Sequence, residues 1–176
     1  MTTPGNSPLR VLILCTGNSA RSQMAEAILN HRSGGRFVAE SAGSQPAARV
    51  NPYAVEALRE VGIDWRGRQP RAVDDLTPGN WEIVITVCDR AREACPIFPG
   101  QPALAHWGME DPASVEGDEE TKRRAFREAV QLISHRIDLM LALPTEKLDR
   151  LALQAHLRTI GAEQPSPSNR ADGAIE

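Results

Sequence analysis

The sequence contains no long hydrophobic run and no strong excess of charge of one sign. No apolar stretch approaches the roughly 20 residues that a membrane-spanning helix needs. Residues 1–10 also lack the apolar segment of a secretory signal peptide. The net charge of −3 argues against a large basic surface for nucleic acid. These absences predict a cytoplasmic protein that binds neither membranes nor nucleic acid.

Cysteine is also scarce, because the 176 residues include only Cys15, Cys88 and Cys95. In a reducing compartment, three cysteines are not expected to form a static disulfide framework, so they should be reduced, catalytic or metal-bound. The chain has no Cys-x2-Cys pair, and we predict no metal site. A zinc site built from the three cysteines and His106 is the alternative.

The segment Cys15–Arg21 is the most informative feature that is present. It follows the apolar run Val11–Leu14 and precedes a helical pattern from Ser22. A strand, a tight loop and a helix in this order form an oxyanion cradle, because loop N–H groups converge and the helix N-terminus adds positive charge. Cys15 is then expected to be a thiolate nucleophile, and Arg21 can hold a tetrahedral anion through two parallel hydrogen bonds. The alternative is a buried structural cysteine beside a surface arginine.

Apolar runs alternate with helical patterns along the chain, which predicts an α/β fold with a parallel sheet covered on both faces. Phe126, Val130 and Ile133 place one face of a long helix in the core. The expected strands cover residues 9–14, 36–41, 81–87 and 103–106, and the expected helices cover residues 22–32, 52–61, 118–141 and 144–160.

The C-terminal part is predicted to lie outside the main domain. Its helix is expected to end at Gly161, with Leu148, Leu151 and Ala155 near one face and Leu153 and Leu157 pointing elsewhere. Such wide apolar coverage predicts packing against the domain of a monomer, with a dimer contact as the alternative. The expected division is a flexible N-terminus (1–8), one domain (9–143), this additional helix (144–161) and a disordered tail (162–176).

Cys88 and Cys95 lie in an irregular segment that is rich in proline and glycine. Cys88 follows the third predicted strand and Cys15 ends the first, so both thiols are expected at the sheet edge where active sites gather. A disulfide needs Cα atoms within about 7 Å, whereas seven extended residues span up to about 25 Å. Residues 89–94 contain no proline or glycine and could form a short helix. Melting of this helix would let Cys95 move toward Cys88. Two unreactive buried thiols are the alternative.

Asp111, in the segment Trp107–Pro112, is a candidate proton donor for a leaving oxygen. The following proline restricts its backbone. Glu110 is the neighbouring competitor, and a simple Asp-Pro turn is the structural alternative. We interpret His106 as structural.

The chain resembles a known family through the residues from Cys15 to Glu26, which look like the phosphate loop of arsenate reductases built on the low-molecular-weight protein tyrosine phosphatase fold. The resemblance implies a four-stranded parallel sheet in a three-layer α/β/α fold, with the C-terminal helix as an addition. The likeness extends from about Leu9 to Leu141 and includes, in order, Ser41–Gly43, Val50–Pro52, Val87–Cys88, Cys95–Pro96, His106–Gly108 and Asp111–Ala113.

The resemblance also implies reduction of arsenate to arsenite for arsenic detoxification. Cys15 would attack arsenic while Asp111 protonates the departing oxygen, and Cys88 would then attack Cys15. Cys95 would next attack Cys88, and an external thioredoxin, or glutaredoxin with glutathione, would reduce the Cys88–Cys95 pair. No bound cofactor is expected, and phosphate and sulfate would compete with arsenate. The implied oxyanion-binding residues are Thr16, Gly17, Asn18, Ser19, Ala20, Arg21 and Ser22, with Asn18 shaping the loop and Ser22 bonded to the sulfur of Cys15.

The sequence departs from the family pattern at two places near this loop. Ala20 stands where some relatives carry an extra cysteine. Asn18, Glu26 and Ser41 match a potassium site of some relatives, but the expected fourth carboxylate is replaced near Arg71. That replacement argues against potassium in this chain.

A low-molecular-weight protein tyrosine phosphatase is the nearest alternative function. It would share Cys15, Arg21 and Asp111 but would not need the other two cysteines. Gln23 and Ala113 stand where such phosphatases usually carry proline and an aromatic residue, so a weak phosphatase side activity is what we expect. A non-catalytic oxyanion-binding or redox-sensing module is the second alternative.

Overall fold

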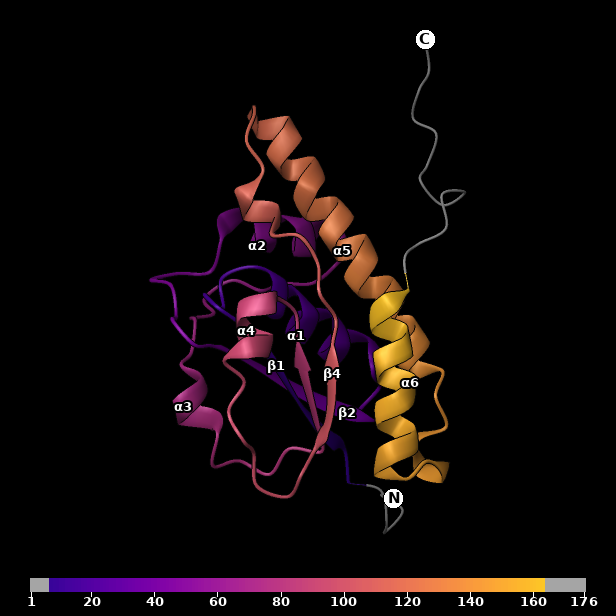
Figure 1. Cartoon of the computed structure of the whole chain (residues 1–176). Coiled ribbons are helices and arrows are strands. Elements are labelled where there is room, and N and C mark those ends of the chain that lie inside the picture. The colour runs from indigo at the N-terminus through magenta and orange to yellow at the C-terminus, as the bar shows by residue number, and fades with distance from the viewer. Residues whose placement is uncertain (1–6, 164–176) are drawn as a thin grey trace.

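The computed structural model describes residues 7–163 and has one sheet at its centre (Figure 1). The sheet has four parallel strands in the order β2-β1-β3-β4. The strands are β1 (Leu9–Cys15), β2 (Phe37–Gly43), β3 (Ile83–Thr86) and β4 (Ala103–His106). The predicted α/β class and four-stranded parallel sheet are confirmed, including the fourth strand at its predicted residues.

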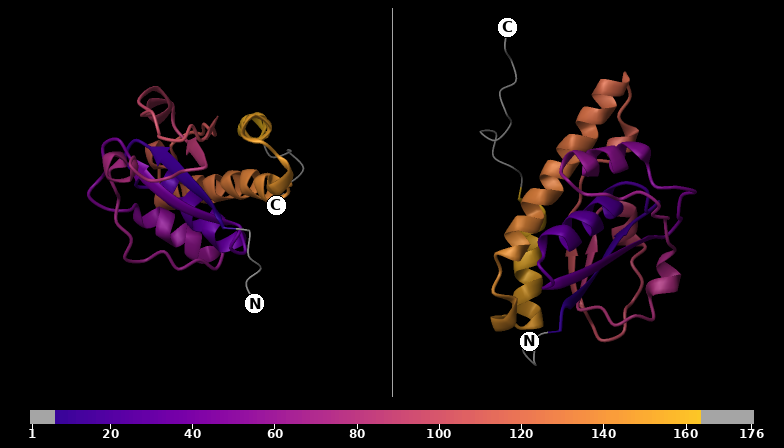
Figure 2. Two further views of the ribbon diagram at one scale, coloured as in Figure 1. Left: turned by 90° about the horizontal axis from the view of Figure 1, so that it is seen from below. Right: turned by 180° about the vertical axis from the view of Figure 1, so that it is seen from behind.

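Helices cover both faces of this sheet and give the predicted three layers (Figure 2). α1 packs on β1 and β2, and α5 runs along α1 and α2. α4 packs on β1 and β3 from the opposite face. The helices are α1 (Arg21–Arg32), α2 (Pro52–Glu60), α3 (Val73–Leu76), α4 (Asp89–Glu93), α5 (Glu119–Leu141) and α6 (Arg150–Ala162), with short 3-10 turns at Pro112–Ser114 and Thr145–Lys147.

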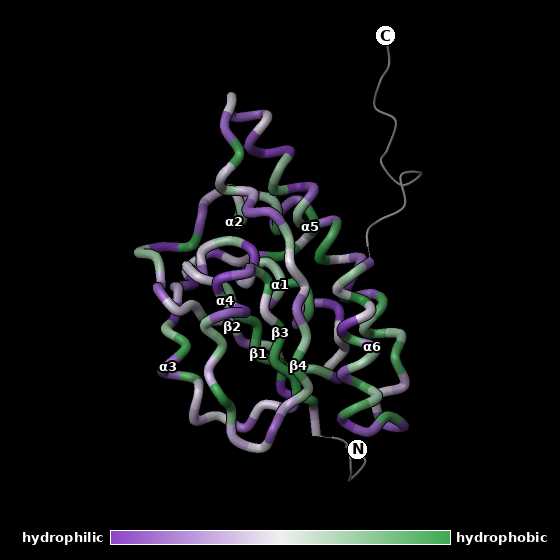
Figure 3. Tube along the Cα trace, viewed as in Figure 1, coloured by the Kyte–Doolittle hydropathy of each residue, from purple (hydrophilic) through white to green (hydrophobic). Residues whose placement is uncertain are grey.

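The core follows the apolar strands, which form the hydrophobic centre in Figure 3. Val11 to Leu14 are all buried because helices cover β1 on both faces. On α5, Phe126, Val130 and Ile133 are buried as their helical spacing predicts. The strand register then aligns Leu14 with Thr86, and Thr86 with His106, so the carboxyl ends of three strands meet at one edge.

The last helix differs from its prediction at both ends. It begins after Asp149, whose side chain accepts a hydrogen bond from the N–H of Ala152, and not at Pro144. It also continues through Gly161. Glycine is needed there for close packing, since a Cβ would collide with the carbonyl oxygen of His106. Leu151 is 63% exposed.

The buried face of α6 carries Leu153, Leu157 and Ile160. α6 covers β4, the strand at one edge of the sheet. Edge strands normally leave backbone groups unpaired. Here the N–H of Leu104 donates to Oε1 of Gln154 at 3.0 Å, and Nε of Arg158 donates to the Leu104 carbonyl at 3.2 Å. The additional helix therefore satisfies part of this edge.

The predicted termini lie almost wholly outside the described residues, since the structure places neither 1–6 nor 164–176. The flexible N-terminus and disordered tail stay predictions. Within residues 7–163, no helix is both long enough and apolar enough to cross a bilayer.

Candidate active site

The loop between β1 and α1 turns its carbonyl oxygens outward. The carbonyls of Thr16, Gly17 and Ser19 accept hydrogen bonds from backbone N–H groups of residues 45, 47 and 51 at 2.8–2.9 Å. Asn18 has a φ of 50°, a left-handed conformation that asparagine tolerates better than most residues. Gly43 also approaches closely, because a Cβ there would meet the Thr16 carbonyl oxygen.

Because the carbonyl oxygens of this loop point outward, its N–H groups remain available to a ligand. Within residues 7–163, the N–H groups of residues 16, 17 and 19–22 donate to no protein acceptor. They stand at the start of α1, where the helix dipole adds positive charge. The loop is therefore a cradle for a tetrahedral oxyanion.

The sulfur of Cys15 is buried at the base of this cradle. The N–H of Asn18 donates to it at 3.1 Å, and the hydroxyl of Ser22 lies 2.8 Å away. Both groups can donate a hydrogen bond to this sulfur. The expected bond between Ser22 and the Cys15 sulfur is present.

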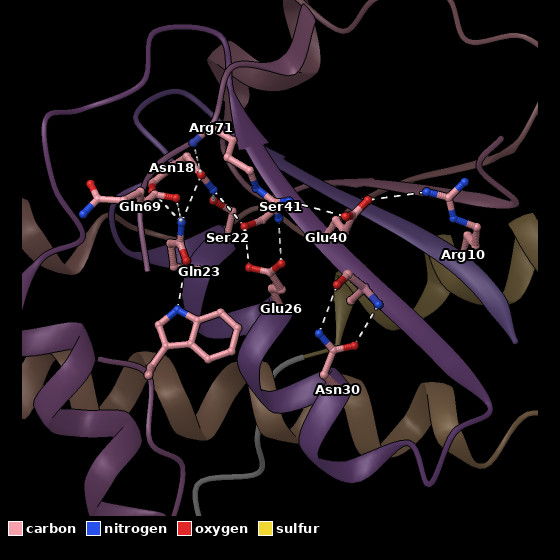
Figure 4. Close-up of polar contacts among 12 residues, drawn as sticks. Arg10, Asn18, Ser22, Gln23, Glu26, Asn30, Glu40, Ser41, Gln69 and Arg71 are labelled. Carbon is pink, nitrogen blue, oxygen red and sulfur yellow. Dashed lines mark hydrogen bonds and ion pairs between the residues drawn. The ribbon is translucent and has the colours of Figure 1, made fainter. Parts of the chain in front are cut away.

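The amide of Asn18 fixes the loop from behind (Figure 4). Its Nδ2 donates to the hydroxyls of Ser22 and Ser41, each at 2.9 Å. Its Oδ1 accepts from Nε2 of Gln23 at 3.0 Å and from the N–H of Arg71 at 2.8 Å. A fully bonded, buried side chain thus ties the nucleophile's hydrogen-bond donor to β2 and to the segment before α3.

Gln23 is a residue that sequence reasoning did not assign to the site. Its Nε2 donates to Asn18, while its Oε1 accepts from the indole N–H of Trp65 at 2.9 Å. The signal available was a polar residue on a helix face that is otherwise buried. Its partner lies 42 residues away, so no local pattern could have identified the pair.

Arg71 occupies the region of the suspected cation site (Figure 4). Its guanidinium lies 2.8 Å from a carboxylate oxygen of Glu26 and 3.4 Å from one of Glu40. Burial raises the pKa of Glu26, while the charge of Arg71 and the hydroxyl of Ser41 lower it. The guanidinium of Arg71 thus pairs with Glu26, one of the three residues that the resemblance matched to a potassium site.

Arg21, the first residue of α1, reaches across to the loop after β4. Its Nη1 donates to the carbonyl of Met109 at 3.1 Å, and its Nη2 lies 3.8 Å from Oδ2 of Asp111. The other oxygen of Asp111 accepts from the N–H of Ala113 at 3.0 Å and fixes the carboxyl group. The Cys15 loop, Arg21 and the candidate proton donor Asp111 are therefore assembled at one sheet edge.

Arg136 on α5 supports that loop, and sequence reasoning missed it. Its side chain is 1% exposed, and Nη1 donates to the carbonyl of Gly108 at 3.1 Å. Burial lowers the pKa of Arg136. No carboxylate forms an ion pair with it among residues 7–163. A buried cation is therefore one of the groups, with Arg21, that hold the loop leading to Asp111.

Cys88 lies next to the cradle and caps α4. Its sulfur is 3.4 Å from the hydroxyl of Thr16 and accepts from the N–H of Ala91 at 3.4 Å. Residues 89–93 form the short helix that the sequence predicted. The side chain of His106 links this helix to the sheet, with contacts to Thr86 at 2.8 Å and to Asp89 at 3.1 Å.

Cys95 lies beyond the end of α4 and is half-buried. Its sulfur contacts the carbonyl of Pro96 at 3.7 Å, and burial raises the pKa of the thiol. All three cysteines are free thiols. In residues 7–163, no group of three His, Cys, Asp or Glu side chains is arranged to hold a metal ion.

Comparison with known proteins gives a consistent result. The family model described as low molecular weight phosphotyrosine protein phosphatase matches residues 10–152. An arsenate reductase of Halalkalibacterium halodurans is 39% identical over 127 residues, which is 72% of this chain and 91% of that protein.

Solved structures give the same match. The arsenate reductase of Archaeoglobus fulgidus is 33% identical, with a TM-score of 0.57 over 73% of this chain and 98% of that one. A thioredoxin-dependent arsenate reductase of Corynebacterium glutamicum is 30% identical, with a TM-score of 0.54 over 76% of this chain and 64% of that one.

Proposed function

The chain belongs to the low molecular weight phosphotyrosine protein phosphatase family, and on that premise we propose that it is an arsenate reductase. The observation that carries the proposal is the contact between Cys88 and Thr16, which puts a second free thiol beside the Cys15 loop. A phosphatase has no use for that thiol. A reductase needs it, because two thiols must supply the two electrons that arsenate accepts.

In the first step, the oxyanion lies in the loop with Arg21 on its oxygens. The Cys15 thiolate attacks arsenic and forms an S–As bond. One oxygen leaves as water, and Asp111 supplies a proton to it. The 3.8 Å between Arg21 and Asp111 supports these roles, because the arginine can hold the anion beside the acid.

In the second step, the Cys88 thiolate attacks the sulfur of Cys15. A Cys15–Cys88 disulfide forms, the S–As bond breaks, and its electron pair reduces arsenic from As(V) to As(III). Arsenite leaves. Cys95 then attacks Cys88, which forms Cys88–Cys95 and returns Cys15 as a thiolate.

The attack of Cys95 on Cys88 requires movement of α4, because Cys88 caps this helix and Cys95 lies beyond its end. A five-residue helix is marginal by itself. The His106–Asp89 contact and the cap at Cys88 are the main ties that its first turn makes. Melting the helix would release both ties and let the two sulfurs meet.

An external thiol must reduce the final disulfide. One solved relative is described as thioredoxin-dependent, which supports a thioredoxin-type reductant for this chain. Thioredoxin, or glutaredoxin with glutathione, would fit the same exchange chemistry. The predicted cytoplasmic location is consistent with such partners and stays a prediction.

The phosphatase reading keeps Cys15, Arg21 and Asp111 but leaves Cys88 and Cys95 without a role. The phosphatase side activity is expected to be weak.

Serine variants of each cysteine test the relay. With arsenate, thioredoxin, thioredoxin reductase and NADPH, wild type should oxidise NADPH continuously. Cys15→Ser should be inactive, and Cys88→Ser should stop after at most one arsenic adduct. Cys95→Ser should complete about one turnover and then hold a Cys15–Cys88 disulfide that peptide mass mapping detects.

The same variants distinguish a phosphatase. A double variant, Cys88→Ser,Cys95→Ser, should keep whatever hydrolysis of p-nitrophenyl phosphate the wild type has. Steady hydrolysis of this ester, together with no arsenate reduction by wild type under either reductant system, would overturn the reductase proposal.

A further inference from the structure

A cavity of about 570 Å³ lies between β4, α6 and the segment that follows α4. It is separate from the oxyanion cradle, since none of the loop residues 15–22 lines it. Its floor includes the apolar side chains of Val84 and Leu104. Cys95 opens into it from the segment that follows α4.

The walls of this cavity carry positive charge. Arg92 and Arg158 both line it, and among residues 7–163 no acidic residue does. Neither arginine forms an ion pair with any residue of the described range 7–163. Arg158 uses Nε on the Leu104 carbonyl, which leaves its two Nη groups for another acceptor. Two guanidinium groups with free N–H donors can each bind a carboxylate.

The additional helix builds much of this cavity. Arg158, Gly161 and Ala162 come from α6, whereas the family model ends at residue 152. Gly161 lets α6 approach the His106 carbonyl closely, so the wall stands directly against β4. A surface built by residues outside the shared family core points to a property of this chain in particular.

We propose that this cavity binds a low-molecular-weight thiol or disulfide that carries carboxylates, with glutathione as its representative, and that this ligand exchanges with Cys95. The inference rests on the proposed function, for which it names a small-molecule partner of the third thiol. The carboxylates of such a ligand would pair with Arg92 and Arg158 while one of its sulfurs faces Cys95.

The chemistry balances without a further reactant. With glutathione disulfide, the Cys95 thiolate attacks one sulfur, a Cys95–glutathione disulfide forms, and the other glutathione leaves as a thiolate that takes up the proton lost by Cys95. A glutathione thiolate releases Cys95 again and leaves as glutathione disulfide.

The test uses a Cys15→Ser,Cys88→Ser protein, in which Cys95 is the sole thiol. Intact-mass kinetics would follow its mixed disulfide with glutathione disulfide, with neutral bis(2-hydroxyethyl) disulfide and with cationic cystamine. We expect a rate that saturates with glutathione disulfide alone. Arg158→Gln and Arg92→Gln should each lower the rate below saturation about five- to tenfold, while the neutral disulfide reacts unchanged.

Controls separate binding from folding and from the proposed function. Arg150→Gln, at the exposed start of the same helix, should leave every rate unchanged. Arg158→Lys keeps the charge and should retain the preference in part. If Arg158→Gln unfolds, as melting would reveal, Arg92→Gln on the other wall decides.

Equal rates for the three disulfides, or unchanged rates in both arginine variants, would overturn the proposal. The assay contains no arsenate, so its failure leaves arsenate reduction with thioredoxin untouched. Conversely, a saturable glutathione site in a protein that never reduces arsenate would contradict the proposed function and leave the glutathione site in place.

Discussion

The loop at residues 15–22 and the segment at residues 88–102 both carry cysteines at the same sheet edge, yet they are built in opposite ways. Asn18 is completely buried and bonded on every polar atom, and the loop carbonyls are held by the chain at residues 44–51. The second segment has one short helix. Ile97 in it is 95% exposed.

The difference matches the two tasks that the proposed reaction divides between them. Binding an oxyanion in its reactive geometry requires donors that are fixed in advance. Moving a disulfide outward requires a segment that can open at low cost. The predictions below either remove the rigidity of the first region or measure the mobility of the second.

The largest effect should come from removing the Asn18 side chain. Asn18→Ala places a non-glycine residue without hydrogen-bonding capacity at φ 50° and leaves the buried hydroxyls of Ser22 and Ser41 without their donor. We expect arsenate turnover to fall about 100-fold or more and the unfolding free energy to fall by about 2–4 kcal/mol. Asn18→Gly accepts the backbone conformation and should recover part of the stability but little of the turnover.

Asn30→Ala is the matched control, because this asparagine lies on α1, the helix that follows the loop, and its amide exchanges two hydrogen bonds with the backbone of Ala39. Urea denaturation should show lower stability with turnover nearly intact. Equal turnover losses in the Asn18 and Asn30 variants would mean that the loop is not specially preorganised.

Hydrogen exchange measures the second region directly. Amides of β1 and α1 should exchange only through large-scale unfolding, whereas those of residues 89–102 should exchange through local opening. We expect at least about a 100-fold difference in protection between Val11–Leu14 and Arg92–Ala94. Comparable protection in the two segments, measured by mass spectrometry on the reduced protein, would contradict a mobile relay.

The sequence predicted the rigid region better than its surroundings. β1 and the start of α1 follow from an apolar run and a short loop, which are local patterns. The cradle and the position of Cys88 followed from a rule about parallel strands. The hydrogen-bond partners of Asn18 could not be predicted in this way, because Ser41 and Arg71 come from distant parts of the chain.

Errors cluster at α6, where close packing overrode local signals. A glycine after an apolar pattern normally ends a helix, but Gly161 continues α6 because the His106 carbonyl lies against it. The sequence places apolar residues on several sides of this helix, and the structure buries Leu153 and Leu157 and exposes Leu151. Wide apolar coverage gives no preferred face until the position of β4 is known.

A smaller effect should follow loss of the Arg71 charge. Arg71→Met leaves the buried Glu26 carboxylate without its cation, and we expect a loss of about 3 kcal/mol in unfolding free energy and about tenfold in turnover. Wild type should not respond when potassium replaces choline at constant ionic strength. Arg66→Met removes an exposed ion pair and should leave stability unchanged.

The sign of the pH dependence identifies the cause of that loss. Burial raises the folded-state pKa of Glu26 above its unfolded value, so its contribution to stability falls as pH rises above about 4.5. Without Arg71 this fall should be steeper and extend to higher pH. Denaturation at pH 5 and pH 8 should therefore show the larger deficit at pH 8, and Glu26→Gln in the same protein should abolish the difference.

The smallest effect concerns the thiol at the mobile end of the relay. Cys15 has two hydrogen-bond donors, whereas Cys95 has burial alone, which raises its pKa. In Cys15→Ser,Cys88→Ser protein, iodoacetamide should modify Cys95 about threefold more slowly at pH 7 than a free cysteine peptide. The rate should rise about tenfold per pH unit from 6.5 to 8.5, because the thiolate is the minor form throughout. A rate that does not change over this range would mean that Cys95 is already a thiolate. The expected difference between Cys15, with its hydrogen-bond donors, and Cys95, with burial alone, would then be wrong.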